Sequence, residues 1–107
     1  MDVQINTANN VAGREALTRQ LEETVRTRLS RFSEQLTRVE VHVSDENGDR
    51  GGGHDKRCVI EVRPAGREPI SVTDQAGSID QAASGALNKA STALDRTFGK
   101  LTDRKGH

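Results

Sequence analysis

Basic side chains recur at helical spacing in the last third of the chain. Lys89, Arg96 and Lys100 are separated by seven and four residues, so a helix would place them in one stripe beside its apolar face. Guanidinium and ammonium groups in such a stripe can neutralise RNA phosphates. A solvated helix face has the same spacing, so the stripe by itself leaves both interpretations open.

A polar stretch near the middle of the chain imitates a ligand loop. Asp45, Asn47 and Asp49 match the start of a calcium loop. The sixth and twelfth positions are Arg50 and Lys56 instead of glycine and glutamate, which argues against calcium. No lysine followed by serine or threonine comes after the glycines, so the stretch does not match a phosphate-binding loop either. A flexible connector is the favoured interpretation.

No group of residues has the composition of a catalytic or metal site. His42 and His54 lack the further ligands of zinc, and Cys58 alternates with Ile60 as a small apolar residue would. No nucleophile, base and orienting group stand together. We therefore predict that the protein is not an enzyme and uses no metal or cofactor.

Length, charge and cysteine content limit the class of protein. The 107 residues suggest one domain, and 32% hydrophobic residues predict a small core. Sixteen basic residues balance sixteen acidic ones, so no global field attracts nucleic acid or membrane. One cysteine excludes an internal disulfide, and no apolar run reaches the ~20 residues of a membrane helix. We expect a soluble, cytoplasmic protein without a membrane or small-molecule partner.

Alternating apolar residues predict a β-hairpin at the centre of the fold. Apolar side chains occupy every second position in residues 39–43 and again in residues 58–62, which is the period of a strand with one wet face. Residues 46–55 join these strands and contain four glycines, so we expect a mobile loop there. The hairpin needs a cover for its apolar face.

Apolar periods of three and four residues predict two helices. The first covers residues 14–35. The second opens at Ser78, which fits a capping box with Gln81. Because its apolar stripe is rich in alanine, we expect it to pack tightly beside the first helix. The stripe consists of Ile79, Ala83, Leu87, Ala90, Leu94, Phe98 and Leu101.

Shorter patterns complete the set of elements. Residues 2–6 alternate as a short strand, and residues 64–67 contain the proline and glycine typical of a turn. Ile70 and Val72 mark a fourth strand, which we expect to be shorter than the others. Residues 102–107 are polar, so we predict a flexible C-terminal tail.

The order strand, helix, strand, strand, strand, helix predicts an α+β sandwich of two layers. Each strand has one apolar face, so both helices belong on the same side of a four-stranded sheet. A right-handed crossover through the first helix makes the first strand parallel to a neighbour, while the other strands form an antiparallel meander. We assign residues 1–101 to this single domain with its mixed sheet.

Three segments carry a resemblance to a known family. Residues 10–17, 37–43 and 78–89, together with the order of elements, resemble the ribosome hibernation-promoting factors and ribosome-associated inhibitor A. The similarity covers nearly the whole chain. It implies binding to the small ribosomal subunit and its RNA, in the channel of messenger and transfer RNA, and inhibition of translation when cells stop growing. Long members add a C-terminal dimerisation domain, which we do not expect in this chain. The sequence leaves the oligomeric state open, with a monomer favoured.

The resemblance also implies an RNA-binding site on the helices. Arg28 and Arg31 match basic positions near the end of the first helix, and Lys89, Arg96 and Lys100 match positions along the second. Two positions depart from the family pattern, because Asp80 replaces a frequent aromatic residue and Thr92 a frequent basic one. With zero net charge, the alternative is a protein-interaction or regulatory module that kept the fold and does not bind RNA.

The predicted open face of the sheet is unsuited to single-stranded RNA. Its side chains mix both signs of charge and include no aromatic ring on which a base could stack. The expected residues of this face are Arg38, Glu40, His42, Arg57, Glu61 and Arg63. We therefore expect the helices to carry any RNA contact.

Overall fold

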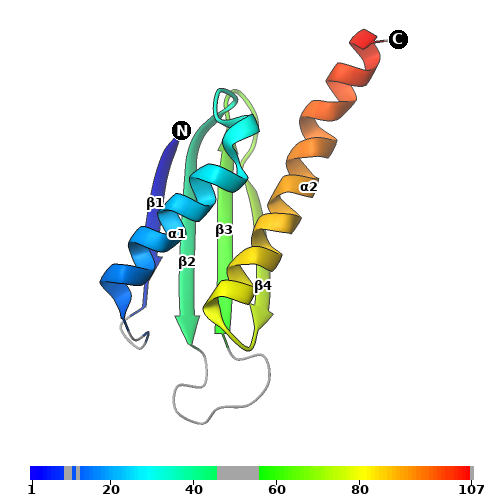
Figure 1. Cartoon of the computed structure of the whole chain (residues 1–107). Coiled ribbons are helices and arrows are strands. Elements are labelled where there is room, and N and C mark those ends of the chain that lie inside the picture. The colour runs from blue at the N-terminus through cyan, green and yellow to red at the C-terminus, as the bar shows by residue number, and fades with distance from the viewer. Residues whose placement is uncertain (9–10, 12, 46–55, 107) are drawn as a thin grey trace.

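The chain folds into two layers, a β-sheet and a pair of helices (Figure 1). The computed structural model describes residues 1–8, 11, 13–45 and 56–106, with side chains as far as residue 98. The elements in chain order are β1 (Asp2–Thr7), α1 (Arg14–Arg28), the 3-10 turn η1 (Ser30–Phe32), β2 (Leu36–Asp45), β3 (Lys56–Pro64), β4 (Ile70–Ala76) and α2 (Ile79–Gly106). This order confirms the predicted β-α-β-β-β-α fold.

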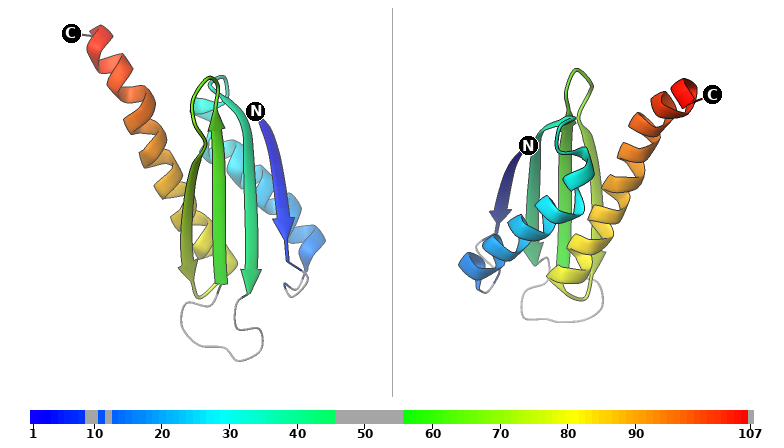
Figure 2. Two further views of the ribbon diagram at one scale, coloured as in Figure 1. Left: turned by 180° about the vertical axis from the view of Figure 1, so that it is seen from behind. Right: turned by 45° about the horizontal axis from the view of Figure 1, so that its top comes forward.

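The strands form one mixed sheet in the order β1-β2-β3-β4. β1 runs parallel to β2, whereas β2, β3 and β4 are antiparallel to one another, as predicted. Ile60 is level with Val41 on one side and with Val72 on the other, so the apolar positions of neighbouring strands are in register. Figure 2 shows both helices on one face of the sheet and no element on the opposite face among the described residues.

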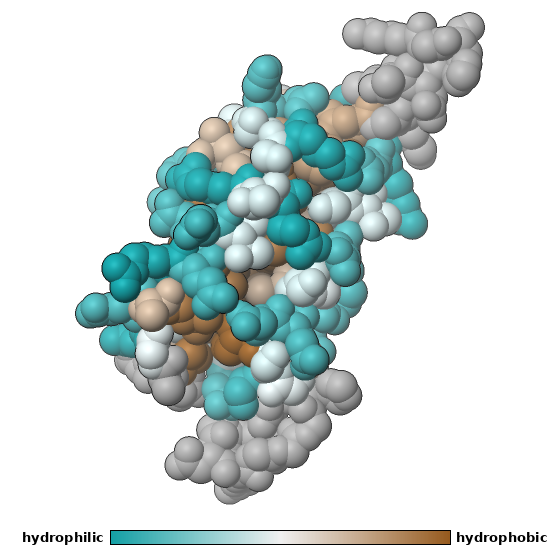
Figure 3. Space-filling view, in the orientation of Figure 1, coloured by the Kyte–Doolittle hydropathy of each residue, from teal (hydrophilic) through white to brown (hydrophobic). Residues whose placement is uncertain are grey.

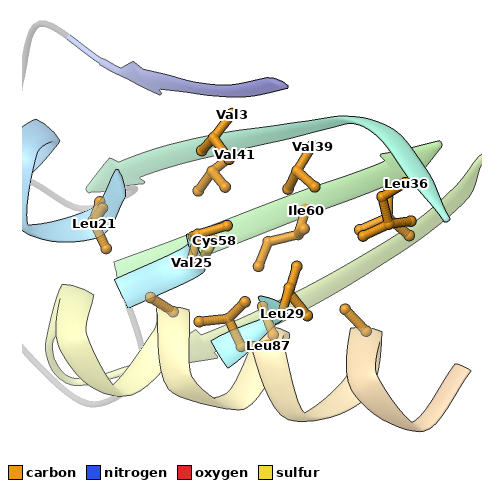
Figure 4. Close-up of a cluster of buried hydrophobic side chains, with 14 of the residues drawn as sticks. Val3, Leu21, Val25, Leu29, Leu36, Val39, Val41, Cys58, Ile60 and Leu87 are labelled. Carbon is orange, nitrogen blue, oxygen red and sulfur yellow. The ribbon is translucent and has the colours of Figure 1, made fainter. Parts of the chain in front are cut away.

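The core lies between the sheet and the two helices (Figure 4). Val39, Val41 and Ile60 are completely buried, and so is Cys58. The predicted facing of the hairpin is therefore confirmed. α1 contributes Leu21 and Val25 to the same cluster, and α2 contributes Leu87.

The first helix ends earlier than the predicted residue 35. α1 stops at Arg28, and Leu29 leaves the helical conformation with φ −108° and ψ 14°. Phe32 and Leu36 are nevertheless buried, which is why the apolar period continued beyond the helix. The chain has to reverse direction here so that β2 can begin at Leu36. The 3-10 turn η1 makes this reversal, and in it the Phe32 N–H donates a hydrogen bond to the Leu29 carbonyl at 3.0 Å.

The alanine stripe of α2 packs against the sheet rather than tightly beside α1. Ala82, Ala86 and Ala90 are completely buried, and α2 lies mainly against β3 and β4. Small side chains let a helix axis come close to whichever surface it covers, and here that surface is the sheet. The predicted start of the helix is confirmed, because the Gln81 N–H donates to Ser78 Oγ at 3.2 Å.

The remaining boundaries differ in detail from those expected. β4 continues to Ala76 and has seven residues against six in β1, so it is not the shortest strand. The turn after β3 is present, because the Arg67 N–H donates to the Pro64 carbonyl at 3.2 Å and Gly66 has φ 71°. The predicted loop at 46–55 lies outside the described residues. α2 runs on to Gly106, and the flexibility of residues 102–107 stays a prediction.

Neither α-helix in the described part of the chain has the length and apolar character needed to cross a membrane.

Candidate nucleic-acid interface

The five basic residues predicted to contact RNA all belong to the helical layer. Arg28 is the last residue of α1, and Arg31 lies in η1. Lys89, Arg96 and Lys100 follow along α2, although the side chain of Lys100 lies outside the described part. The packing of both helices on one face of the sheet therefore places all five positions in the same layer of the molecule.

Arg31 forms a two-pronged ion pair with Asp95 of α2. Its Nη1 donates to Oδ1 at 2.6 Å and its Nη2 donates to Oδ2 at 2.9 Å. These hydrogen bonds raise the pKa of Arg31 and lower the pKa of Asp95. The Arg31 guanidinium also lies over the ring of Phe32, 4.3 Å from its centroid. A planar fork on a carboxylate has well-defined geometry, so Asp95 sets the orientation of the Arg31 guanidinium in this structure.

Arg28 joins the end of α1 to the same side of α2. Its Nη2 donates to Asn88 Oδ1 at 2.5 Å, and its Nη1 is 3.4 Å from Ser84 Oγ. Ser84, Asn88 and Asp95 share one face of α2, because they are four and seven residues apart. The two arginines thus reach one side of α2 from α1 and η1.

Lys89 lies on the other side of α2, over the edge strand β4. Its Nζ donates to the Thr73 carbonyl at 2.7 Å and to Asp74 Oδ1 at 3.2 Å. Asp74 occupies an inward-facing position of β4, opposite Cys58 of β3. The Asp74 carboxylate lies against the backbone of Gly85, where a Cβ would collide with it. Gly85 therefore makes the room that this carboxylate occupies.

The basic residues form two groups rather than one continuous patch. Arg28 and Arg31 contact the side of α2 that faces α1, whereas Lys89 contacts β4. Arg96 follows Lys89 by seven residues and so lies on the Lys89 side. Among the described side chains, Arg96 has no ion-pair partner and is exposed. The exposed residues Gln81 and Thr92 lie between the two groups around the helix axis, and we call them the exposed ridge of α2.

The open face of the sheet carries a cluster of mixed charge, as expected. Glu40 lies at its centre, with Arg38 Nε at 3.2 Å, His42 Nε2 at 3.6 Å and Arg63 Nη2 at 3.8 Å. Arg63 also pairs with Glu61 at 3.0 Å. Opposite charges neutralise one another here, so this face has no uniform attraction for phosphate.

A pocket of about 330 Å³ opens between the N-terminal ends of the two helices. Val11, Leu17 and Ile79 supply its apolar wall. Figure 3 shows brown apolar surface in this gap, surrounded by hydrophilic surface on both helices. Within the described ranges, no three His, Cys, Asp or Glu side chains are grouped as metal ligands.

Cys58 has the environment of a structural residue. It is completely buried between the sheet and the helices. Burial, with a smaller contribution from the charge of Asp74, raises the pKa of the thiol to about 12. A thiol is nucleophilic as the thiolate, so Cys58 is unsuited to covalent catalysis.

Sequence reasoning missed the partners of the basic residues. Asp74, Asn88 and Asp95 were not singled out, and neither was Gly85. One signal was available, because Asp74 stands in the apolar register of Ile70 and Val72, two residues after Val72. A charge at an inward position needs a partner, and a glycine inside a helix often marks a close approach.

The fold is that of a small α+β domain whose polar helical layer carries the candidate contacts. The chain belongs to the family described as Sigma 54 modulation protein / S30EA ribosomal protein, which matches residues 5–102. This confirms the resemblance to hibernation-promoting factors and ribosome-associated inhibitor A. The family is one of ribosome-associated proteins.

Solved structures share the fold. A ribosomal subunit interface protein from Coxiella burnetii is similar with a TM-score of 0.67 at 13% identity, covering 92% of this chain and 99% of that one. The N-terminal domain of Protein Y from Thermus thermophilus gives a TM-score of 0.66 at 17% identity, covering 91% and 99%. No curated protein sequence matches the chain.

Proposed function

We propose that this protein is a translation-inhibition or hibernation factor that binds the RNA of the small ribosomal subunit through its helical layer. The match to the family over residues 5–102 carries this proposal. The proposed contacts are Arg28, Arg31, Lys89, Arg96 and Lys100. The activity is non-enzymatic, because occupying a ribosomal channel requires shape and affinity but no bond chemistry. Its location is cytoplasmic, because the family is ribosome-associated.

The two basic groups suit a folded RNA. A helix with its side chains is about 10–12 Å across, so groups on its two sides reach different strands or turns of RNA backbone. Arg28 and Arg31 would serve one backbone segment, and Lys89 with Arg96 the other. The exposed ridge of α2 between them would enter the groove or gap that the two segments form.

Co-sedimentation with purified small subunits at moderate salt tests the proposal. We expect Arg96→Gln combined with Lys100→Gln to weaken binding roughly tenfold or more, because two phosphate contacts are lost. The matched control is Arg57→Gln with Arg63→Gln on the open sheet face, which removes the same charge. Neutralisation is preferred to reversal, because a glutamate at position 63 would stand beside Glu40 and Glu61.

Each result has a definite meaning. Equal weakening by the helix pair and the sheet pair would show that only overall charge matters. Failure of the unaltered protein to sediment with small subunits would refute RNA binding and favour the alternative, a protein-interaction or regulatory module. Zero net charge and the apolar pocket between the helix ends are the observations that favour this alternative.

A further inference from the structure

Three of the proposed RNA-binding side chains are already held by acceptors within the chain. Arg31 is bound by Asp95, Arg28 by Asn88 and Ser84, and Lys89 by Asp74 and the Thr73 carbonyl. Every one of these acceptors belongs to a different element from the side chain that it binds. A phosphate oxygen reaching these cations would use the same N–H groups.

The two carboxylates cancel the positive charge at their positions. Arg31 with Asp95 and Lys89 with Asp74 each sum to zero, whereas Arg28 is held by neutral groups and Arg96 has no ion-pair partner among the described residues. The attraction of the helical layer for polyanions is therefore lower than its basic residues suggest.

Both ion pairs are accessible enough to open. The side chains of Arg31 and Asp95 are 58% and 52% exposed, and those of Lys89 and Asp74 are 54% and 27% exposed. An exposed pair such as Arg31 with Asp95 holds weakly. In the second pair the cation Lys89 is the exposed partner, so a ligand with several phosphates can reach both cations. A single phosphate competes poorly, because the internal carboxylate is tethered beside its cation and so has a high effective concentration.

We propose that Asp95 and Asp74 limit the affinity of the helical layer for RNA, and that binding exchanges each carboxylate for a phosphate at Arg31 and Lys89. This inference rests on the proposed function and identifies residues that set its strength. It assigns the two aspartates a role opposite to that of the basic residues: they hold the cations in place and make weak, isolated phosphate contacts unproductive. Gly85 leaves the space in which the Asp74 carboxylate lies, because a Cβ at this position would collide with it.

The test neutralises each acid without changing its shape. Asp95→Asn and Asp74→Asn retain an oxygen that accepts from Arg31 or Lys89 but remove the negative charge. We expect each variant to bind purified small subunits about 3- to 10-fold more tightly, because a charge about 5–6 Å from the incoming phosphate is removed. The combined variant should gain about the product of the two factors.

Asp2→Asn is the matched control. Asp2 is exposed on β1, away from α2, and its replacement removes the same charge. We expect it to change affinity less than twofold. Denaturant midpoints of all variants show whether the fold is intact.

The outcomes separate this inference from the proposed function. Unchanged or weaker binding by Asp95→Asn and Asp74→Asn, with the loss in Arg96→Gln plus Lys100→Gln still present, overturns the inference and leaves the function standing. An equal gain in Asp2→Asn also overturns it, because the effect is then global. Absence of binding by the unaltered protein and by every variant overturns both.

Discussion

Ile60 and Glu61 are neighbours in β3 but face opposite sides of the sheet. Ile60 is completely buried, whereas Glu61 lies on the open face and pairs with Arg63 at 3.0 Å. We expect Ile60→Ala to lower the free energy of unfolding by roughly 2–4 kcal/mol, because it leaves a cavity in a small core. Glu61→Ala should change it by less than about 0.5 kcal/mol. Urea unfolding measures both, and equal midpoint shifts would contradict the assigned facing.

We expect the buried thiol of Cys58 to make the free energy of unfolding decrease above pH 9. Burial raises the pKa of its thiol from 9.0 to about 12, so above pH 9 the unfolded chain loses this proton while the folded chain keeps it. The stabilising contribution is complete below pH 9 and is lost as pH rises toward 12. By pH 11 the loss should be about 2–3 kcal/mol.

Cys58→Ala is the control for this prediction, since it has no thiol to titrate. Denaturant unfolding of both proteins between pH 8 and pH 11 measures the difference, and titration of all other groups cancels in the comparison. Parallel pH profiles for the two proteins would show that the Cys58 thiol has an ordinary pKa. At pH 8 we also expect thiol reagents to modify Cys58 only as fast as the protein opens.

At the scale of elements, the contact between α2 and β4 depends on Gly85 and Asp74. Alanine is favoured over glycine in a helix by about 1 kcal/mol, but at position 85 its Cβ would collide with the Asp74 carboxylate. We expect Gly85→Ala to destabilise the protein by about 1 kcal/mol, since Asp74 must turn away and leave Lys89. In an Asp74→Ala background, the same change should stabilise it by up to about 1 kcal/mol.

A double-mutant cycle measured by thermal or urea unfolding checks this reversal of sign. The coupling free energy between the two positions should be about 2 kcal/mol. If Gly85→Ala stabilises the protein equally in both backgrounds, then Asp74 does not occupy the space beside the helix. The cycle therefore tests whether the Asp74 carboxylate lies against Gly85, and it does so without a ribosome-binding measurement.

At the scale of the whole molecule, internal ion pairing should appear in the salt dependence of ribosome binding. Five phosphate contacts would give a slope of log affinity against log salt of about 3.5–4.5 in magnitude. Because Arg31 and Lys89 are compensated by Asp95 and Asp74, we expect about 2–3 for the unaltered protein. The slope is measured by determining the affinity for small subunits at a series of potassium chloride concentrations.

The variants extend this measurement. Asp74→Asn combined with Asp95→Asn should steepen the slope toward about 4. All five cations then neutralise phosphates and release RNA counterions, and no freed aspartate takes up a counterion in return. Asp2→Asn should leave the slope unchanged. A slope near 4 in the unaltered protein would show that the aspartates do not compensate the cations in solution.

The sequence by itself determined the type and order of the elements. Alternation in β2 and β3 and the three-and-four period of α1 and α2 are local patterns that follow from strand and helix geometry. One apolar face on each strand then required both helices on the same side of the sheet. These features follow from residues close in sequence, so they were predictable without coordinates.

Only the tertiary structure decided where α1 ends and what the basic residues contact. The apolar spacing of Leu29, Phe32 and Leu36 shows that these side chains are buried but does not show in which type of element. Because β2 has to begin at Leu36, the chain turns back through the 3-10 turn η1 and does not continue as a helix. Arg28 and Arg31 meet partners 60 and 64 residues away, and Lys89 meets Asp74 at a separation of 15. Such distant side chains become neighbours only through the packing of α1, η1, α2 and β4, and that packing is why Arg28, Arg31 and Lys89 are already held by acceptors within the chain.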